Sequence, residues 1–317
     1  MNNAALLRAR VARGILFAAL GGTFWGFSGT CAQLLTTTYG LDPGWIICIR
    51  LPFAALLFLA VSAVRERDRL IAAVRDPKTL LGIALFALFG ILLTQYSYLT
   101  AISLTNAGTG TVMERLGLVL LTILVCVMAR RLPRVREVAG VLLAIAGTFL
   151  IATKGSFEGL AIPPEALVWG FLLSCGFVGY TLLPEKLLAK WGSFIVTGLG
   201  MLVAGAIICA VEQPWNVPVE FSPGMVAALA AMVILGTFLA YLFYLQGVKE
   251  AGAMRAGLVG CIEPVAATVF SAVWLNTAVT WADIAGMALI IGMVVLVTVK
   301  PKDEKRGASG LSQNQGR

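Results

Sequence analysis

Long apolar runs dominate the hydrophobic pattern of the chain. A helix needs roughly 20 apolar residues to cross about 30 Å of hydrocarbon. The pattern predicts ten such helices, and Gly, Pro or charged residues separate most of them. The expected spans are residues 14–38, 43–63, 79–99, 104–128, 135–153, 162–183, 192–211, 223–246, 251–274 and 281–300.

The composition agrees with this pattern. Of the 317 residues, 59% are hydrophobic and only 13% are charged. Soluble domains contain about 45–50% apolar and about 25% charged residues, so a water-soluble fold is excluded. The sequence therefore predicts an all-α integral membrane protein whose spanning surface contacts the lipid bilayer.

The basic residues predict the orientation of the chain. Lys and Arg concentrate in cytoplasmic loops. With the N-terminus inside, all but three of the 24 Lys and Arg residues fall in cytoplasmic segments, the exceptions being Arg50, Arg115 and Lys154. The net charge of +8 thus reflects membrane topology, and we expect no nucleic-acid partner. We expect a multi-pass protein of the bacterial cytoplasmic membrane with cytoplasmic tails at 1–13 and 301–317.

The second half of the sequence repeats the first. Trp25-Gly26-Phe27 recurs as Trp169-Gly170-Phe171, and residues 98–153 align with 244–299 without a gap. Five spans per half is an odd number, so the repeats 14–153 and 162–300 should have opposite orientations. Inverted repeats are typical of secondary transporters, with the ligand site between the halves near the midplane. The alternative is a duplicated scaffold that transports nothing.

Three motifs resemble a known family. Trp25-Gly26 in the first span, Arg50 early in the second and Cys261-Ile262-Glu263-Pro264 in the ninth are similar to the EamA family of the drug/metabolite transporter superfamily. The resemblance covers about 14–300 and implies a ten-helix exporter or exchanger of small metabolites, often amino acids, that works without ATP. One segment departs from the family pattern. Residues 113–118 contain charges where relatives have an uncharged stretch ending in Pro, so the substrate does not carry over by analogy.

Four charged residues lie within the expected spans, although each costs at least about 2.5–3.5 kcal/mol to insert. They are Arg50, Glu114, Arg115 and Glu263. Their charges sum to zero, which suggests mutual compensation. Glu263 precedes Pro264, which frees an upstream carbonyl. Glu263 either binds a cation or titrates for proton coupling, or it is a structural group bonded to a neighbouring helix.

Glu114 and Arg115 are consecutive, so they lie about 100° apart around a helix and should not form a tight pair with each other. We expect one to face the interior and the other a neighbouring helix. Together they could hold the ammonium and carboxylate of an amino acid, or they could serve only in packing. Arg50 lies roughly 10 Å into its span and should reach toward the outer face, as a gate or structural charge.

Aromatic residues deep within the spans complete the predicted substrate or coupling cavity. They either stack on a ligand or cation, or pack without further role. These candidates are Trp25, Tyr96, Tyr98, Trp169, Tyr180, Tyr241 and Tyr244.

The residues and motifs that the sequence lacks argue against an enzyme. The chain contains no His, and we find no GxSxG or Walker motif, so an enzyme is not expected. We expect no metal or cofactor, whereas proton or sodium coupling stays open.

The sequence predicts a secondary transporter for a small polar metabolite, an amino acid or related compound moved by export. The alternative is uptake or exchange of a quaternary amine such as choline. The pattern leaves the oligomeric state open.

Overall fold

The computed structural model describes residues 3–128, 130–155, 161–252, 256, 259–260 and 262–298. Every element that it gives these residues is helical. Cys261 and the expected C-terminal tail 301–317 lie outside the described residues.

The first half forms a series of helices joined by short turns. Its elements are α1 (Asn3–Thr37), α2 (Pro43–Arg65), α3 (Arg67–Arg75), α4 (Pro77–Phe86), the π-helix η1 (Ala87–Leu92), α5 (Leu93–Leu104), α6 (Ala107–Arg115), α7 (Gly117–Met128) and α8 (Val135–Thr153).

The second half follows a similar order. Its elements are α9 (Pro164–Leu182), α10 (Glu185–Trp191), α11 (Ser193–Glu212), the 3₁₀-helix η2 (Pro214–Asn216), α12 (Pro223–Val233), the π-helix η3 (Ile234–Leu239), α13 (Ala240–Ala251), α15 (Ile262–Leu275) and α16 (Trp281–Thr298).

Among the residues that the structure describes, seven helical segments are long and apolar enough to cross a membrane. They are Arg8–Thr37, Pro43–Arg65, Pro77–Leu104, Ala107–Met128, Pro164–Trp191, Ser193–Glu212 and Pro223–Ala251. The other three expected spans overlap the shorter apolar helices Val138–Ile151, Ile262–Leu275 and Trp281–Leu296. The protein is therefore a multi-pass membrane protein, and ten crossings remain a prediction.

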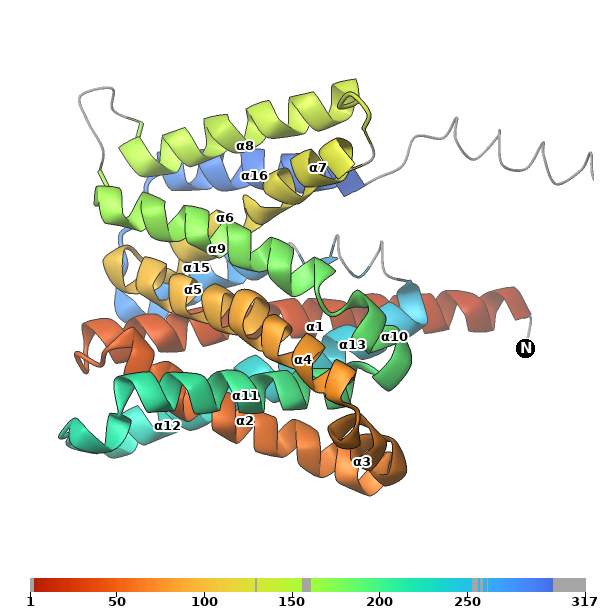
Figure 1. Ribbon diagram of the computed structural model, residues 1–317. Coiled ribbons are helices and arrows are strands. Elements are labelled where there is room, and N and C mark those ends of the chain that lie inside the picture. Colours follow the sequence, from red (N-terminus) through yellow and green to blue (C-terminus); the bar gives the residue numbers. More distant parts are fainter. Residues whose placement is uncertain are drawn as a thin grey trace, which may run out of the picture.

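The long helices lie side by side in one bundle, and Figure 1 shows their directions. We call the end where α1 begins the N-terminal end, and the opposite end the far end. Helix α1 runs from the N-terminal end to the far end, whereas α9 runs in the opposite direction (Figure 1). Helices of different halves pack together: α1 on α13 and α15, α2 on α11, α5 on α9, and α8 on α16.

Local sequence signals explain where several helices begin. Proline starts α2, α4, α9 and α12, where its missing N–H is not needed. Asp42 accepts a bond of 2.7 Å from the N–H of Gly44 at the start of α2. Asn106 accepts one of 2.9 Å from the N–H of Thr109 at the start of α6. These side chains satisfy backbone donors that the first turn of a helix leaves unpaired.

The expected span 104–128 corresponds to Ala107–Met128, within which a turn at Leu116 separates α6 from α7. The N–H of Leu116 bonds 3.1 Å back to the carbonyl of Met113, which is a tighter turn than in an α-helix. The next residue, Gly117, has the Phe177 side chain against it, 2.6 Å from where a Cβ would lie. A close approach of α7 to α9 thus coincides with the break.

Two π-helical turns occur at corresponding places in the two halves. Helix η1 joins α4 to α5, and η3 joins α12 to α13. In η3 the Thr237 hydroxyl donates a 3.0 Å bond to the carbonyl of Met232, five residues earlier. Single π-helical turns are frequent at functional sites.

Candidate functional site

A polar cavity of about 390 Å³ lies between the two halves of the bundle. Helices from both halves line it with charged, aromatic and hydroxyl side chains. Its lining consists of Trp25, Ser28, Arg50, Thr94, Gln95, Tyr98, Glu114, Arg115, Leu118, Phe177, Tyr180, Thr181, Tyr241, Tyr244, Glu263 and Val294. All four charged residues singled out in the sequence are thus brought together.

One ion pair crosses this cavity. Arg115, the last residue of α6, donates from Nη2 to Oε2 of Glu263 in the first turn of α15. Glu263 is only 5% exposed. A buried carboxylate without a partner would be costly, so this pair compensates both charges. Sequence spacing could not reveal it, because the two residues come from different halves.

Arg50 does not reach toward the outer face, so that expectation is wrong. Its side chain is buried, with Nε donating 3.0 Å to the hydroxyl of Thr237 and Nη1 donating 2.9 Å to Oε1 of Gln95. These acceptors lie on η3 and α5, on the cavity side of α2. Two inward hydrogen bonds hold the guanidinium at the cavity and link it to a π-helical turn.

Glu114 and Arg115 both contribute to the lining of the cavity. As expected for consecutive residues of one helix, they do not form a tight pair with each other, and Arg115 instead bonds Glu263 on the neighbouring helix α15. In the described part of the chain Glu114 forms no ion pair within contact distance, but it interacts electrostatically with Arg115 and Arg50. Its carboxylate is the acidic group of the cavity that the Arg115–Glu263 pair does not use.

Aromatic rings form one wall of the cavity. The ring of Trp25 lies 4.9 Å from that of Tyr244 and 5.5 Å from that of Tyr241, measured between centroids. The hydroxyls of Tyr180 and Tyr241 form a hydrogen bond between α9 and α13. Rings in this arrangement present π faces and hydroxyls that suit a cationic or zwitterionic ligand.

Tyr96 and Trp169 do not line this cavity, which corrects their predicted placement. Their rings pack against each other with centroids 5.5 Å apart, beside the apolar core. Tyr96 lies two residues before Tyr98, and therefore about 200° away around α5. Trp169 lies about three turns before Tyr180 on α9, so it is near the other end of that helix. Trp25 and Trp169 correspond in sequence, but only Trp25 lines the cavity.

Sequence analysis missed several polar residues of the cavity. Ser28, Thr94, Gln95 and Thr181 line it, and Thr237 binds Arg50 beside it. The available signal was an uncharged polar side chain in an otherwise apolar span. That signal also marks Gln33, which lies outside the cavity.

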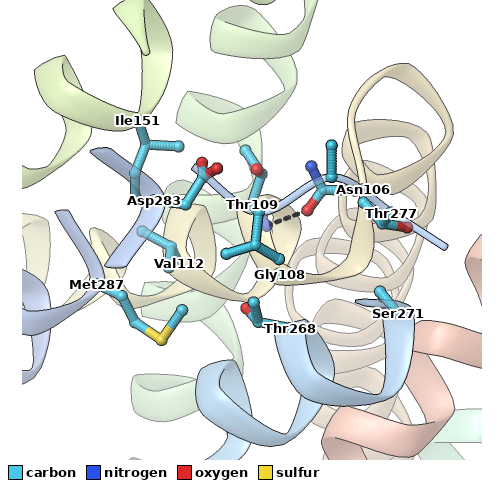
Figure 2. A pocket seen from close by; sticks show the side chains of 12 residues that line it. Asn106, Gly108, Thr109, Val112, Ile151, Thr268, Ser271, Thr277, Asp283 and Met287 are labelled. Atoms are coloured by element: carbon cyan, nitrogen blue, oxygen red, sulfur yellow. Dashed lines mark hydrogen bonds between the residues drawn. The ribbon is translucent and has the colours of Figure 1, made fainter. Parts of the chain in front are cut away.

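Gln33 is the centre of a buried hydrogen-bond network at the far end. Its Oε1 accepts 2.9 Å bonds from the N–H of Ala107 and the hydroxyl of Ser271, and its Nε2 donates 2.8 Å to Thr277. The network thus joins α1, α6 and the end of α15. Beside it, side chains of α6, α15 and α16 surround a pocket of about 20 Å³, which Figure 2 shows.

The Gln33 network separates the cavity from the far end. On α1 the cavity residues Trp25 and Ser28 precede Gln33, and on α15 Glu263 precedes Ser271. An ion pair between Lys154 and Asp283 adds a contact between α8 and α16 at the same end. Both sets of contacts therefore tie helices of the two halves together at the far end.

Polar contacts also link the halves at the N-terminal end. Arg13 donates two 2.8 Å bonds to the carboxylate of Glu250, which joins α1 to α13. Asp76 accepts 2.8 Å bonds from Lys190 and from the hydroxyl of Thr79. The Lys190 ammonium and these hydrogen bonds hold the pKa of Asp76 well below its usual range.

A helical bundle that crosses the membrane around a charged cavity between two halves is typical of membrane transporters. Comparison with known proteins places the chain more exactly. The EamA-like transporter family matches residues 12–153 and again residues 165–299. The protein therefore belongs to the EamA-like transporter family and is a membrane transporter of the drug/metabolite type.

Relatives from distant organisms are also named as transporters. The chain is 28% identical over 296 residues to the uncharacterized inner membrane transporter YicL of Salmonella typhimurium, covering 93% of this chain and 98% of YicL. It is 26% identical to an uncharacterized transporter of Archaeoglobus fulgidus, covering 69% of this chain and 76% of that protein. A solved crystal structure matches 90% of this chain and 96% of its own with a TM-score of 0.62 at 18% identity, a likeness of fold alone.

Proposed function

We propose that the protein is a secondary transporter that exports a small polar metabolite, an amino acid or a related compound, by alternating access. In this proposal residues 14–153 and 162–300 are two inverted five-helix repeats in the cytoplasmic membrane. Three observations support the repeat: the family matches twice, η1 and η3 recur at corresponding places, and α1 and α9 begin at opposite ends (Figure 1).

The observation that carries the proposal is the balanced charge of the cavity. Arg115 and Glu263 neutralise each other, which leaves the Glu114 carboxylate and the Arg50 guanidinium on the same cavity. A zwitterion complements this arrangement, since its ammonium suits Glu114 and the nearby aromatic rings, and its carboxylate suits Arg50. An α-amino acid is a zwitterion of suitable size for a cavity of about 390 Å³.

The direction of transport follows from the orientation that we propose. With the N-terminus in the cytoplasm, the Gln33 network closes the outer side and the cavity lies on the cytoplasmic side of it. This arrangement corresponds to an inward-facing state that loads substrate from the cytoplasm. Glu263, or sodium bound elsewhere, would then supply the coupling to an ion gradient.

A second candidate is uptake or exchange of a quaternary amine such as choline. The cluster of Trp25, Tyr241 and Tyr244 favours it, because aromatic faces bind quaternary ammonium groups. A quaternary amine without a carboxylate would leave Arg50 on its present partners, Thr237 and Gln95.

Counterflow in proteoliposomes tests both candidates. Vesicles preloaded with an unlabelled amino acid or with choline are supplied with the same compound in radiolabelled form, and its accumulation is measured. The proposal expects accumulation of at least one amino acid by the wild type, with Glu114→Gln reducing it roughly tenfold or more. Accumulation of choline alone would favour the second candidate, and no accumulation of either class would contradict both.

Glu165→Gln is the matched control, because it removes a carboxylate from the exposed first turn of α9, away from the cavity. We expect this variant to transport like the wild type. Glu263→Gln tests the coupling in the same assay. If its transport and the pH dependence of that transport both equal those of the wild type, Glu263 is not the coupling group.

A further inference from the structure

A groove on the outside of the bundle, away from the cavity described above, has a volume of about 520 Å³. It lies between α7 and α8, near the connection that joins them. Its walls are almost entirely apolar, and two guanidinium groups belong to its lining. The walls include Ile123 and Val127 on α7 and Val138 on α8, and the connection contributes Arg130 and Arg131.

The apolar walls are open to their surroundings. Ile123 is 47% exposed, Val127 66% and Val138 45%. These residues belong to helices that we expect to cross the bilayer, so they are exposed to lipid chains rather than to water. A hydrocarbon chain would fill this groove without any protein partner.

The two arginines determine which lipid fits best. Arg130 and Arg131 come two and three residues after the last residue of α7, so we expect them where this helix leaves the hydrocarbon. Guanidinium groups bind phosphate through paired, charge-assisted hydrogen bonds. The groove therefore combines a place for an acyl chain with a place for an anionic headgroup.

We propose that this groove binds one anionic phospholipid, with an acyl chain between α7 and α8 and its phosphate at Arg130 and Arg131. Figure 1 shows the α7–α8 connection toward the N-terminal end of the bundle. In the orientation proposed above this is the cytoplasmic leaflet, where basic residues attract anionic headgroups. The site itself does not depend on the transported substrate.

Native mass spectrometry of the purified protein tests the proposal. The protein is titrated separately with palmitoyl-oleoyl phosphatidylglycerol and palmitoyl-oleoyl phosphatidylcholine, and the bound lipid is measured. We expect one phosphatidylglycerol to remain under activation that removes phosphatidylcholine. Arg130→Gln/Arg131→Gln should lower the phosphatidylglycerol adduct roughly tenfold or more. Equal retention of the two lipids by the wild type would overturn the proposal.

The same connection provides a matched control. Arg134 and Arg136 carry the same charge but do not line the groove. Arg134→Gln/Arg136→Gln should lower the adduct by no more than about twofold. If this variant loses as much lipid as the first, general attraction to the basic connection explains the binding and the proposed site is wrong.

A second pair of variants tests the apolar part of the site. Val138→Trp fills the groove from α8 and should lower binding of both lipids, while size-exclusion chromatography confirms that the protein is folded. Should this variant not fold, Val127→Trp introduces the same bulk at a more exposed position on α7. Undiminished binding by a folded Trp variant would contradict an acyl chain between the helices.

Discussion

At the scale of single residues, Arg115 and Glu263 determine much of the energetics of the cavity. Each charge compensates the other where water is scarce, and Glu263 is 5% exposed. Removing one partner of such a pair is expensive, because the remaining charge stays buried. Removing both charges should cost much less stability, because no unpaired charge is then left buried.

This asymmetry gives a prediction for a double-mutant cycle. Arg115→Gln and Glu263→Gln should each reduce stability by about 3 kcal/mol. The double variant should lose much less than the sum, because no uncompensated charge remains. Thermal unfolding of the four proteins in detergent measures the coupling. Additive losses would show that the two side chains do not depend on each other.

Asp76 allows a prediction about acid stability. Its pKa is lowered in the folded protein, mainly by the hydrogen bond from Lys190. A lowered pKa stabilises the fold above the unfolded value of about 3.9, and this stabilisation is lost as the pH falls toward the folded value. Asp76→Asn should therefore lower the Tm at pH 7 and reduce the loss of Tm between about pH 5 and pH 3.

Asp68→Asn is the control for this measurement, because Asp68 is exposed on the neighbouring helix α3. It should show the acid dependence of the wild type. A steep acid dependence in Asp76→Asn would assign the effect to other carboxylates.

At the scale of helices, close packing depends on small residues. A Cβ at Gly26 would lie 2.7 Å from the carbonyl oxygen of Glu263 and from the amide nitrogen of Ala267, both backbone atoms of α15. At Gly170, the corresponding residue of the second half, a Cβ would meet the flexible Met113 side chain at 3.1 Å. Gly292 on α16 has open space around it.

Substitution of each of these glycines by alanine should change stability to a different extent. Gly26→Ala should destabilise the protein by about 1–3 kcal/mol, because α1 must move away from α15. Gly170→Ala should cost less, since the Met113 side chain can adjust. Gly292→Ala should be neutral or should stabilise by up to about 1 kcal/mol, because Ala is the better helix former. Thermal unfolding gives the order, and an equal effect at all three positions would refute this account.

The helices themselves could largely be predicted from hydrophobic runs, whereas their interruptions could not. Expected span 43–63 lies within α2, and 192–211 lies almost entirely within α11. The break at Leu116 and the turns η1 and η3 lie in sequence that is compatible with an uninterrupted helix. They coincide with contacts such as Phe177 on Gly117, which depend on residues distant in sequence.

Most residues of the site could likewise be predicted from the sequence, whereas their pairing could not. Intramembrane charges and deep aromatic residues pointed to most of the cavity, because polar groups are costly in lipid. Which charges pair depended on how the two halves meet, so the Arg115–Glu263 pair and the inward direction of Arg50 did not follow from spacing. Tyr96 was misplaced because its position around α5 depends on which face of that helix contacts α9.

At the scale of the whole molecule, the two ends of the bundle are held by different contacts. The far end has the Gln33 network, which contains backbone and uncharged side-chain groups, and the Lys154–Asp283 ion pair. The N-terminal end has charged pairs, including Arg13 with Glu250. In the alternating access proposed above, the contacts at one end break while those at the other end form, so these groups should control the balance between the two proposed states.

Gln33→Ala tests this control. It removes the acceptor for the N–H of Ala107 and the link to Thr277, so the start of α6 should open more often. Hydrogen–deuterium exchange of a peptide covering residues 106–113 should be faster than in the wild type. Thr36→Ala is the control, because within the described residues the Thr36 hydroxyl bonds to carbonyls of its own helix α1. Equal exchange in Gln33→Ala and the wild type would show that the network does not hold this end closed.

The π-helical turn η3 is bonded to a charged residue of the cavity. Thr237 accepts a hydrogen bond from Arg50 and donates its own proton to Met232, so the guanidinium and the widened turn share one hydroxyl. A carboxylate that draws Arg50 away would weaken this anchor. If the widened turn then relaxed to ordinary α-helix, the following residues would advance by one position, about 100° around the axis. Tyr241 and Tyr244 would then leave the cavity wall, and a ligand bound at the proposed site would lose its contact with their rings.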